Sequence, residues 1–373
     1  MTSVTLVSTA DDGECGIGTY TGSLISDMDG EVDVTHVTVP LRSKNPLPYI
    51  TNAVRAGRSS DDVIHVQHEY GIFGPKSIWS WLFFPVLYFV AFLRNTPVVL
   101  TLHSAWNRET IDPPLALLKR VYVKLNNLLL VAGASYLILL SENCKDRFEE
   151  SVPLRRYEMM SHGVQTETVS MNTSDAKRVF GYDSTETVVV VPGYIRPEKG
   201  QDVFVKIADR APEYEFLIAG GVQADEDEEF LREVERTAPE NVQITGMLDD
   251  SRFNAAFNAA DVAVLPYRDV TQSGIFNWCV AYEVPTVVSD ELYFRRLNEQ
   301  WDCVSLFDVE DPESATMQIQ DLLSNEERRM KIAEGMRNYG KASSMETVIE
   351  KHIWIYEAVD TSDRRHFDQV ETA

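Results

Sequence analysis

A repeated alternation of short apolar runs and helix-length segments leaves few folds open to this chain. The first series is VTLVST at 4–9, VIHVQ at 63–67, VVLTLH at 98–103 and YLILLS at 136–141. The second is TVVVVPG at 187–193, YEFLIAGG at 214–221, VQITG at 242–246, DVAVLPY at 261–267 and PTVVSD at 285–290. Strands separated by helix-length crossovers are typical of parallel sheets. We therefore predict an α/β protein of two Rossmann-like, doubly wound domains.

The 373 residues are enough for two domains of ordinary size, with a cleft expected between them. A polar run without sustained apolar periodicity places the boundary near 166–185. After it, helical patterns occupy 312–340, and ETVIEKHIWIYEAV suits one final packed helix. The remaining residues, DTSDRRHFDQVETA, are expected to fray.

The chain is strongly acidic, with 58 acidic and 34 basic side chains and a net charge of -24. This charge repels phosphate backbones, so no nucleic-acid partner is expected, and a carboxylate-rich surface suits high salt. Four scattered cysteines, Cys15, Cys144, Cys279 and Cys303, lack ligand spacing, which disfavours a zinc site or a disulfide framework. No secretory signal is expected at MTSVTLVST, so we predict a cytoplasmic location.

One apolar stretch, IWSWLFFPVLYFVAFL at 78–93, allows three interpretations. A buried or surface helix is the first, interfacial docking on a membrane the second, and true insertion the third. The stretch is short for a bilayer span and is interrupted by Ser80 and Pro85. Docking requires nearby cations, which Lys119, Arg120 and Lys124 would supply, so peripheral contact with the inner membrane face stays open.

Three motifs fall at the carboxyl ends of predicted strands, where open parallel sheets bind ligands. Residues 15–20, CGIGTY, would bring backbone close to phosphate or sugar oxygens, or form a structural turn. Residues 193–200, GYIRPEKG, place Arg196 and Lys199 in one loop, as a diphosphate leaving group requires, or form a salt-bridged turn. Residues 269–276, DVTQSGIF, would hold phosphate oxygens at a helix N-terminus, or act as a helix cap.

Histidines accompany two strands of the first series. Because side chains alternate along a strand, His65 and Gln67 share one face and His68 lies at the strand end. Burial of either His65 or Gln67 stays open. His103, at the end of VVLTLH, is the better functional candidate. His162, near the domain boundary, would line the cleft or belong to a turn.

At this point the chain resembles the GT-B glycosyltransferases, and among them the large retaining family 4, also called glycosyl transferases group 1. The matching segments are GIGTY, VIHVQHEYGIF, VVLTLHSAW, SHGV, GYIRPEKGQD, ITGMLDDSRF, ADVAVLPY and PTVVSD, in this order over nearly the whole length. The resemblance implies two domains facing across a cleft. These are an acceptor-side domain at 1–170, completed by a helix at 346–362, and a nucleotide-sugar-binding domain at 171–345, with a flexible tail at 363–373.

The resemblance also implies roles for individual residues. His103, Arg196 and Lys199 would be catalytic, with His103 near the transferred sugar and the two cations on the donor diphosphate. Further donor contacts would come from Gly16, Gly18, Gly246, Met247, Leu248, Asp269, Gln272, Ser273 and Gly274. Acceptor-side residues would be Thr19, Tyr20, His68, Glu69 and Tyr70. We expect transfer with retention to a glycan, lipid-linked or small acceptor, with no metal and no cofactor besides the nucleotide sugar as co-substrate.

One departure from the family pattern leaves a second hypothesis open. The family's Glu-x7-Glu element would fall near Val270 and Trp278, which are not acidic, with nearby Asp269 as a candidate partial substitute. Glu283 replaces the usual glycine two residues before the proline. The alternative is therefore a non-catalytic GT-B binding or assembly subunit that has lost donor turnover.

Overall fold

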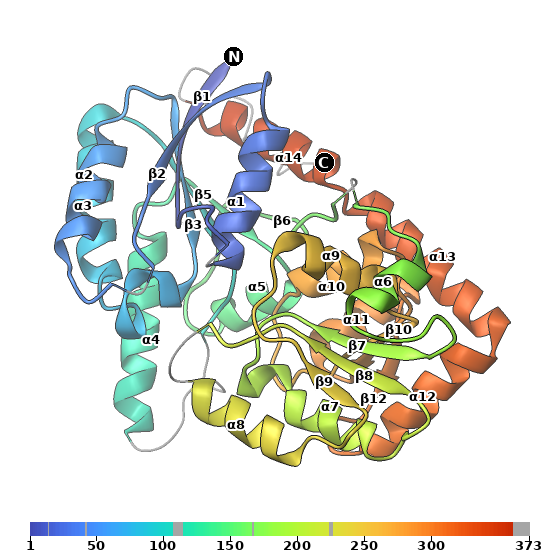
Figure 1. Ribbon diagram of the computed structural model, residues 1–373. Coiled ribbons are helices and arrows are strands. Elements are labelled where there is room, and N and C mark those ends of the chain that lie inside the picture. Colours follow the sequence, from blue (N-terminus) through green and yellow to red (C-terminus); the bar gives the residue numbers. More distant parts are fainter. Residues whose placement is uncertain (14, 42, 107–114, 166–167, 224–226, 361–373) are drawn as a thin grey trace. The chain divides into compact units, whose positions relative to one another are not determined.

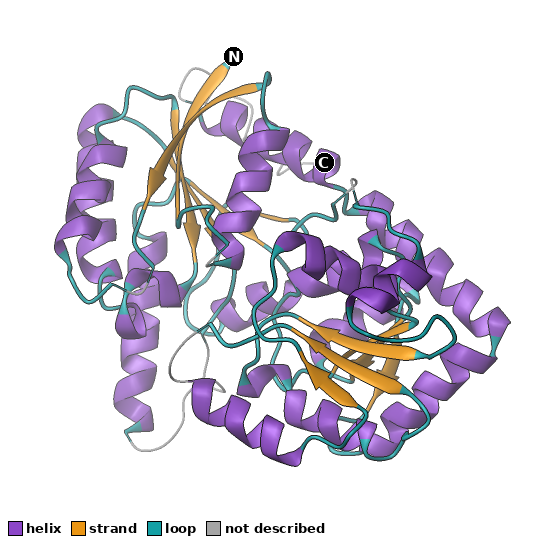
Figure 2. Ribbon diagram, viewed as in Figure 1, coloured by secondary structure: helices purple, strands orange, loops and turns teal. Residues whose placement is uncertain are grey.

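The computed structural model describes residues 1–13, 15–41, 43–106, 115–165, 168–223 and 227–360. The chain divides into two compact units, one of Met1–Ser161 with Met345–Ala373 and one of His162–Ser344. The tail predicted at 363–373 lies outside the described residues. Each unit is a parallel sheet covered by helices on both faces (Figures 1 and 2). The α/β, doubly wound prediction is confirmed.

The first unit has a six-stranded sheet in the order β2-β1-β3-β4-β5-β6, with every pair parallel. The strands are β1 (Thr2–Ser8), β2 (Val32–Thr38), β3 (Val63–His68), β4 (Val98–Leu102), β5 (Tyr136–Leu139) and β6 (Tyr157–Met159). The helices are α1 (Gly16–Asp27), α2 (Leu47–Gly57), α3 (Ser80–Arg94), α4 (Ala116–Val131), α5 (Glu142–Glu149) and α14 (Met345–Val359). Two short 3-10 helices, η1 (Tyr70–Phe73) and η2 (Pro75–Ser77), follow β3.

The second unit repeats the plan with the order β12-β11-β10-β7-β8-β9, again all parallel. Its strands are β7 (Val188–Pro192), β8 (Glu215–Ala219), β9 (Val242–Ile244), β10 (Val262–Leu265), β11 (Thr286–Ser289) and β12 (Ser305–Phe307). Its helices are α6 (Thr173–Val179), α7 (Gln201–Ala208), α8 (Glu228–Thr237), α9 (Asp250–Ala259), α10 (Gly274–Ala281), α11 (Leu292–Trp301), α12 (Pro312–Ser324) and α13 (Glu326–Ala342). A 3-10 helix, η3 (Pro197–Lys199), precedes α7.

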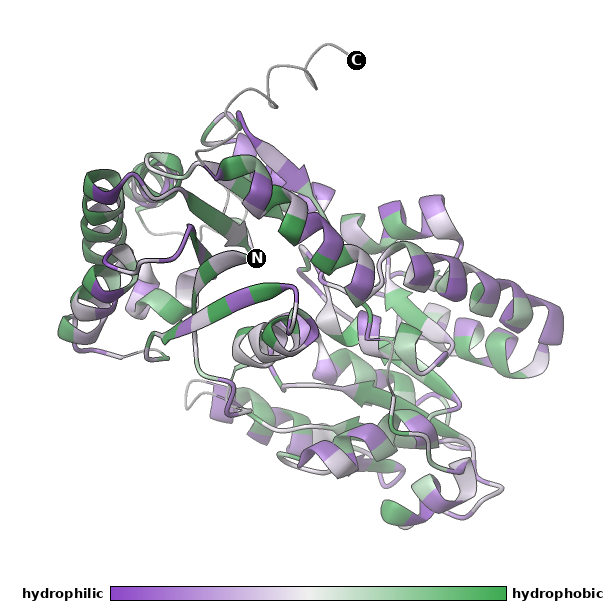
Figure 3. Ribbon diagram, turned by 90° about the horizontal axis from the view of Figure 1, so that it is seen from above, coloured by the Kyte–Doolittle hydropathy of each residue, from purple (hydrophilic) through white to green (hydrophobic). Residues whose placement is uncertain are grey.

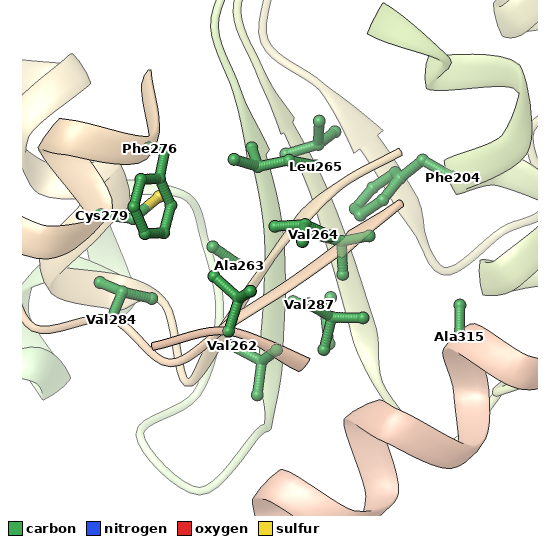
Figure 4. Packing of buried hydrophobic residues seen from close by; sticks show 14 of the residues in the cluster. Phe204, Val262, Ala263, Val264, Leu265, Phe276, Cys279, Val284, Val287 and Ala315 are labelled. Carbon is green, nitrogen blue, oxygen red and sulfur yellow. The ribbon is translucent and has the colours of Figure 1, made fainter. Parts of the chain in front are cut away.

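The core of the second unit shows why its strands are almost wholly apolar. Residues 262–265 of β10 are all buried and lie between helices on the two faces of the sheet (Figure 4). Phe276 and Cys279 of α10 pack in this cluster, as do Phe204 of α7 and Ala315 of α12. A parallel strand covered on both faces needs apolar side chains at every position, whereas the helices keep a hydrophilic side (Figure 3).

Three strands, β2, β6 and β12, were not predicted from the sequence. All three are at an edge of their sheet. In strand β2 Val32 and Val37 are buried and the five other residues are exposed or half-buried, and β6 and β12 have three residues each. Edge strands lack the continuous apolar run that identifies a central strand.

The second unit begins at His162, earlier than the expected change of domain at residue 171. The backbone N–H of Val164 donates to the carbonyl of Ser343 at 2.8 Å. The side-chain amide of Asn277 donates to the carbonyl of Gly163 at 2.8 Å and accepts from the Tyr339 hydroxyl at 2.9 Å. These bonds attach the HGV segment to α10 and α13, so His162 lies within the second unit.

Helix α14 belongs to the first unit although it follows the second in sequence. Its apolar side chains, including Val348 and Ile355, are buried in the cluster that contains Val4 and Leu6 of β1. The Tyr356 hydroxyl lies 2.7 Å from Nδ1 of His65 on β3. The helix predicted from ETVIEKHIWIYEAV is therefore confirmed and contributes directly to the core of the first unit.

Candidate functional site

The strand order creates one topological switch point in each unit. In the second unit β7 lies between β10 and β8, and in the first unit β1 lies between β2 and β3. At a switch point the chain continues from two adjacent strands in opposite directions along the sheet. The loops after these two strands therefore diverge and leave room for a ligand. The three predicted motifs all begin at or beside these two strands.

The loop after β7 is shaped by Gly200. This residue has a φ of 70°, and a Cβ there would collide with the carbonyl oxygen of Pro266, which follows β10. Arg268 strengthens the same junction, because its guanidinium donates to both carboxylate oxygens of Asp202 at 2.7 and 2.6 Å. The loops after β7 and β10 are therefore held against each other.

The loop after β7 contains two cations, Arg196 and Lys199. The Lys199 Nζ lies 3.7 Å from the centroid of the Tyr267 ring, and the side chain is half-buried. Among the residues that the structure describes, no carboxylate forms an ion pair with Lys199. Burial lowers its pKa to about 8, with Arg196 adding to the effect and Glu198 opposing it. The ammonium is thus desolvated and supported by an aromatic face, which leaves it able to bind an anion.

Arg196 is positioned by several partners. Its guanidinium donates to the Gln223 side chain, and it lies 3.6 Å from the Asp227 carboxylate and 3.8 Å from that of Glu198. The guanidinium also lies 5.9 Å from the centroid of the Tyr194 ring. Arg196 is therefore oriented by the loop after β8 and shares its charge with two carboxylates.

The loop after β10 ends at the N-terminus of α10. Ser273 is buried, and its hydroxyl accepts the backbone N–H of Phe276 at 3.1 Å, so Ser273 is the helix cap. Gly274 is the first helical residue, and the imidazole of His162 lies 3.6 Å from the position of a Cβ there. Burial lowers the pKa of His162 to about 4, so this imidazole is neutral near pH 7. Gln272 is half-buried beside the cap, whereas Asp269 is exposed.

His162 was not among the predicted donor residues. The motif SHGV identifies the segment, but only the tertiary contact with α10 shows that the imidazole faces Gly274. A neutral imidazole beside helix N-terminal amides can donate or accept one hydrogen bond without adding charge.

The loop after β9 contributes residues 245–248. Gly246 has a φ of 70°, and the Thr245 hydroxyl accepts the backbone N–H of Gly220 at 3.0 Å. The Met247 side chain is 56% exposed and Leu248 is half-buried. An exposed apolar side chain beside a tight backbone turn is suited to contact a flat ring.

Val270 and Trp278, at the two positions expected for the Glu-x7-Glu element, have no acidic side chain. Val270 is buried, and Trp278 packs against Phe253, Phe257 and Tyr282 at ring-centroid distances of 6.2 Å. Trp278 is therefore part of an aromatic cluster between α9 and α10. Asp269 lies in the loop before Ser273, one residue before buried Val270, and is the acidic group nearest in sequence to that position.

Glu283, which stands where the family has glycine, adopts the conformation that glycine prefers. Its φ is 53°, and its carboxylate lies 3.3 Å from the Arg337 guanidinium on an exposed surface. A Cβ in the left-handed region costs about 1 to 2 kcal/mol, whereas an exposed ion pair contributes less.

Glu283→Gly is therefore expected to raise the free energy of unfolding by about 1 kcal/mol. Urea denaturation measures it, and Glu283→Gln, which removes the ion pair but keeps the Cβ, is the matched control. The control should stay within about 0.5 kcal/mol of the parent protein. A glycine variant less stable than the glutamine variant would refute this account of the position.

In the first unit His103 is held by a buried chain of polar groups. Its Nε2 lies 2.7 Å from the Gln67 side-chain oxygen, which can only accept, so Nε2 carries a proton. The Gln67 amide lies 3.4 Å from Nε2 of His65, which also lies 2.7 Å from the Thr101 hydroxyl. His65 Nδ1 lies 2.7 Å from the Tyr356 hydroxyl of α14. His65 and Gln67 lie on one strand face, as predicted, and both are buried.

The glycine-rich loop after β1 lies at the switch point of the first unit. Gly18 packs so closely on the carbonyl of Ala10 that a Cβ would collide with it, whereas Gly16 is exposed with open space around it. The N-cap residue, Cys15, makes no side-chain hydrogen bond to the first turn of α1. A pocket of about 320 Å³ opens beside this turn, lined by residues that include Thr9, Cys15 and Pro40.

Thr19 and Tyr20 of α1 differ in exposure. Thr19 is exposed, whereas Tyr20 is buried with its ring edge-on to His103 at a centroid distance of 5.5 Å. Tyr20 therefore packs beside the imidazole. Of the two, only Thr19 presents its side chain to solvent.

The acceptor-side prediction for His68 and Tyr70 does not match their burial. The His68 imidazole is buried against the rings of Phe73 and Tyr70, and burial lowers its pKa to about 3. Tyr70 stacks on Trp106 and donates to the Asn127 side chain at 2.7 Å. Both faces of this parallel sheet are covered, so a side chain at the strand end is also buried. Glu69 is half-buried and accepts the backbone N–H of Gly71 at 2.6 Å.

Within the described ranges, no group of three or more His, Cys, Asp or Glu side chains is arranged to hold a metal ion. The four cysteines are buried and free.

Comparisons with known proteins show similarity to glycosyltransferases. Residues 172–339 match the family model described as Glycosyl transferases group 1. The chain is 24% identical over 119 residues to the processive diacylglycerol alpha-glucosyltransferase of Acholeplasma laidlawii, covering 32% of this chain and 36% of that protein. It is 25% identical over 134 residues to the alpha-galactosylglucosyldiacylglycerol synthase of Streptococcus pneumoniae, covering 35% and 34%. The matches thus span about a third of these relatives' length.

Solved structures match over almost the whole chain. Anabaena Alr3699/HepE in complex with UDP and glucose has a TM-score of 0.76 at 13% identity, covering 96% of this chain and all of that one. A glycosyltransferase from Rickettsia africae has a TM-score of 0.71 at 15% identity, covering 97% and 99%. At such identities the likeness concerns the fold. The chain therefore has the GT-B fold of two Rossmann-like units, and most of its second unit matches the model of the glycosyl transferases group 1 family.

Proposed function

We propose that this protein transfers a sugar from a nucleoside diphosphate sugar to an acceptor, with the donor diphosphate bound by the second unit. The observation that carries this proposal is the ammonium of Lys199, held 3.7 Å from the Tyr267 ring at the β7–β10 switch point. An ammonium without a carboxylate partner among the described residues favours an anionic ligand. In a chain with 58 acidic side chains, a lysine ammonium that no carboxylate neutralises indicates a specific function.

Arg196 and the first turn of α10 complete the proposed donor site. As the glycosidic bond breaks, negative charge develops on the diphosphate, and fixed donors stabilise it. Lys199 provides a point charge and Arg196 a planar fork. The cap of Ser273 and the amide of Gly274 provide dipoles that favour an anion. Met247 and Leu248 would contact the base, and Gln272 and Asp269 would take part in donor binding.

The first unit would provide His103 and the glycine-rich loop. With Nε2 bound to Gln67, the orientation of the His103 ring is fixed, as is required of a group that contacts the transferred sugar. Exposed Gly16 would allow phosphate or sugar oxygens to approach the first turn of α1, and Gly18 would keep this turn close to Ala10. Thr19 and Glu69 are the remaining acceptor-side candidates with accessible side chains.

The acceptor is proposed to be lipid-linked. Both curated relatives are named for diacylglycerol glycosides, and the two names describe alpha linkages. Retention at the anomeric carbon is proposed on the same ground and on the resemblance noted above. We further propose that the leaving diphosphate is stabilised by Arg196 and Lys199 without a metal ion, at a cytoplasmic location.

A non-catalytic binding subunit is the second candidate. The observation in its favour is that Val270 and Trp278, at the two positions of the Glu-x7-Glu element, are not acidic, with Val270 buried and Trp278 half-buried against Phe253. Incubation with a panel of UDP-, GDP- and ADP-sugars separates the two functions. Release of the nucleoside diphosphate supports transfer or hydrolysis, whereas binding without any release supports the second candidate.

The pH dependence of donor binding tests the role of Lys199. Since its pKa is about 8 in the free protein, the ammonium is charged below pH 8 and loses its charge above it. Donor affinity is therefore expected to fall about tenfold per pH unit above about pH 8. Lys199→Arg, which stays charged, should show a flat profile over the same range. An identical alkaline fall in the arginine variant would assign that fall to another group.

A further inference from the structure

Helices α3 and α4 of the first unit expose apolar side chains to an unusual extent. On α3, Phe89, Phe92 and Leu93 are 63%, 81% and 66% exposed. On α4, Leu117, Val121 and Leu125 lie four residues apart on one helix side and are 76%, 48% and 46% exposed. Figure 3 shows hydrophobic residues along helices at the outer edge of this unit. Full solvation of this many large apolar side chains is unfavourable, which indicates an interaction surface.

The two helices form one platform. The Trp81 and Tyr122 rings lie 6.1 Å apart, and the Tyr88 hydroxyl donates to the carbonyl of Leu130. Both contacts join α3 to α4 in the same order along the two sequences, so the helices run parallel. The Tyr122 hydroxyl also donates to the carbonyl of Lys76 at 2.7 Å, just before α3.

The charge of this region is opposite to that of the whole chain. Between Glu69 and Glu142 the sequence contains two of the 58 acidic residues, Glu109 and Asp112. Helices α3 and α4 contain no carboxylate, and their charged residues are Arg94, Lys119, Arg120 and Lys124. A surface that combines cations with exposed leucine and phenylalanine is complementary to an anionic, apolar partner.

We propose that the α3–α4 platform docks on an anionic lipid bilayer, with its apolar side chains in the acyl boundary and its cations at the headgroups. No described helix is long and apolar enough to span a membrane, so the helices would lie in the interface plane. A second copy of this chain is a poorer occupant, because a two-fold interface would bring the same cations together without carboxylates to pair with them. The proposal rests on the proposed function in one respect: a lipid-linked acceptor would be met at this surface.

Salt concentration distinguishes the contribution of the cations to membrane binding from that of the apolar side chains. At about 1 M salt the Debye length is about 3 Å, so the cations act only on headgroups in direct contact. The apolar part is not weakened in this way. Binding should therefore decrease from low to high salt but persist, whereas a purely electrostatic contact would be lost.

Sedimentation of the full chain with vesicles tests the proposal. Vesicles of phosphatidylcholine with phosphatidylglycerol are compared with phosphatidylcholine alone. The double variant Phe92→Gln, Leu117→Gln should bind the anionic vesicles at least about tenfold more weakly. The control is Met317→Gln, Met330→Gln, two similarly exposed apolar residues of α12 and α13, which should bind like the parent protein.

Three results would overturn the proposal. They are no binding of the parent protein to anionic vesicles, equal binding by both double variants, or a parent dimer in light scattering that the Phe92/Leu117 variant dissociates. Donor binding is measured in the same samples without vesicles. A parent protein that binds vesicles but no donor would reject the proposed function alone. A parent protein that binds the donor but no vesicles would reject the membrane-docking proposal alone.

Discussion

Replacing Lys199 with methionine is expected to lower kcat/KM for sugar transfer by about 10²- to 10³-fold, equivalent to about 3 to 4 kcal/mol of transition-state stabilisation. Methionine keeps an unbranched side chain that can still lie on the Tyr267 ring. The variant therefore removes the charge and little of the packing. Steady-state kinetics with a donor that the parent protein uses measure the effect, and circular dichroism verifies the fold.

Lys206→Met is the matched control for this variant. Lys206 is on α7, in the same unit, with a side chain 59% exposed and an ammonium 3.8 Å from Asp202. An exposed ion pair of this kind contributes little, so the control should retain nearly full activity. If Lys199→Met turned over the donor at the parent rate, the proposed diphosphate contact would be rejected.

Gly200→Ala is expected to destabilise the protein by about 3 kcal/mol or more. The positive φ accounts for about 1 to 2 kcal/mol of this, and the collision of the new Cβ with the Pro266 carbonyl accounts for the rest. Because the obstacle is backbone that follows β10, the loop carrying Lys199 would have to move. Donor affinity should therefore fall along with stability.

Gly181→Ala isolates the conformational part of this effect. Gly181 has a φ of 87°, but nothing lies within 4 Å of the Cβ position. Its alanine variant should lose only the cost of the positive φ, about 1 to 2 kcal/mol. Urea denaturation measures both variants. Equal losses at the two glycines would show that the contact between the loops after β7 and β10 contributes nothing.

The central strands and the loops that follow them could be predicted because a parallel strand covered on both faces is apolar throughout. That rule identified β7 and β10 and hence the positions of Lys199 and Ser273. The same rule explains why the side chains of His68 and Tyr70 are buried. A residue at the end of such a strand is buried by the next layer, whatever its polarity, and only the aromatic cluster around Phe73 reveals this.

Other features depend on contacts distant in sequence. The His162 imidazole faces Gly274 because the HGV segment is bonded to Asn277 and Ser343, which no local pattern encodes. The apolar run at 78–93 predicted a helix but not which side chains are exposed. That depends on the packing of α3 against α2 and α4. The scarcity of carboxylates between Glu69 and Glu142, where the sequence has two, was present in the sequence, and becomes informative once α3 and α4 are seen as neighbours.

The most direct measurement is calorimetric titration of the parent protein and the Lys199→Met variant with UDP, GDP and ADP at pH 7. We expect the parent protein to bind at least one of these nucleoside diphosphates and the variant to bind it at least about tenfold more weakly. No binding of any of the three by the parent protein, or equal affinity in the two proteins, would contradict a donor diphosphate site at Lys199.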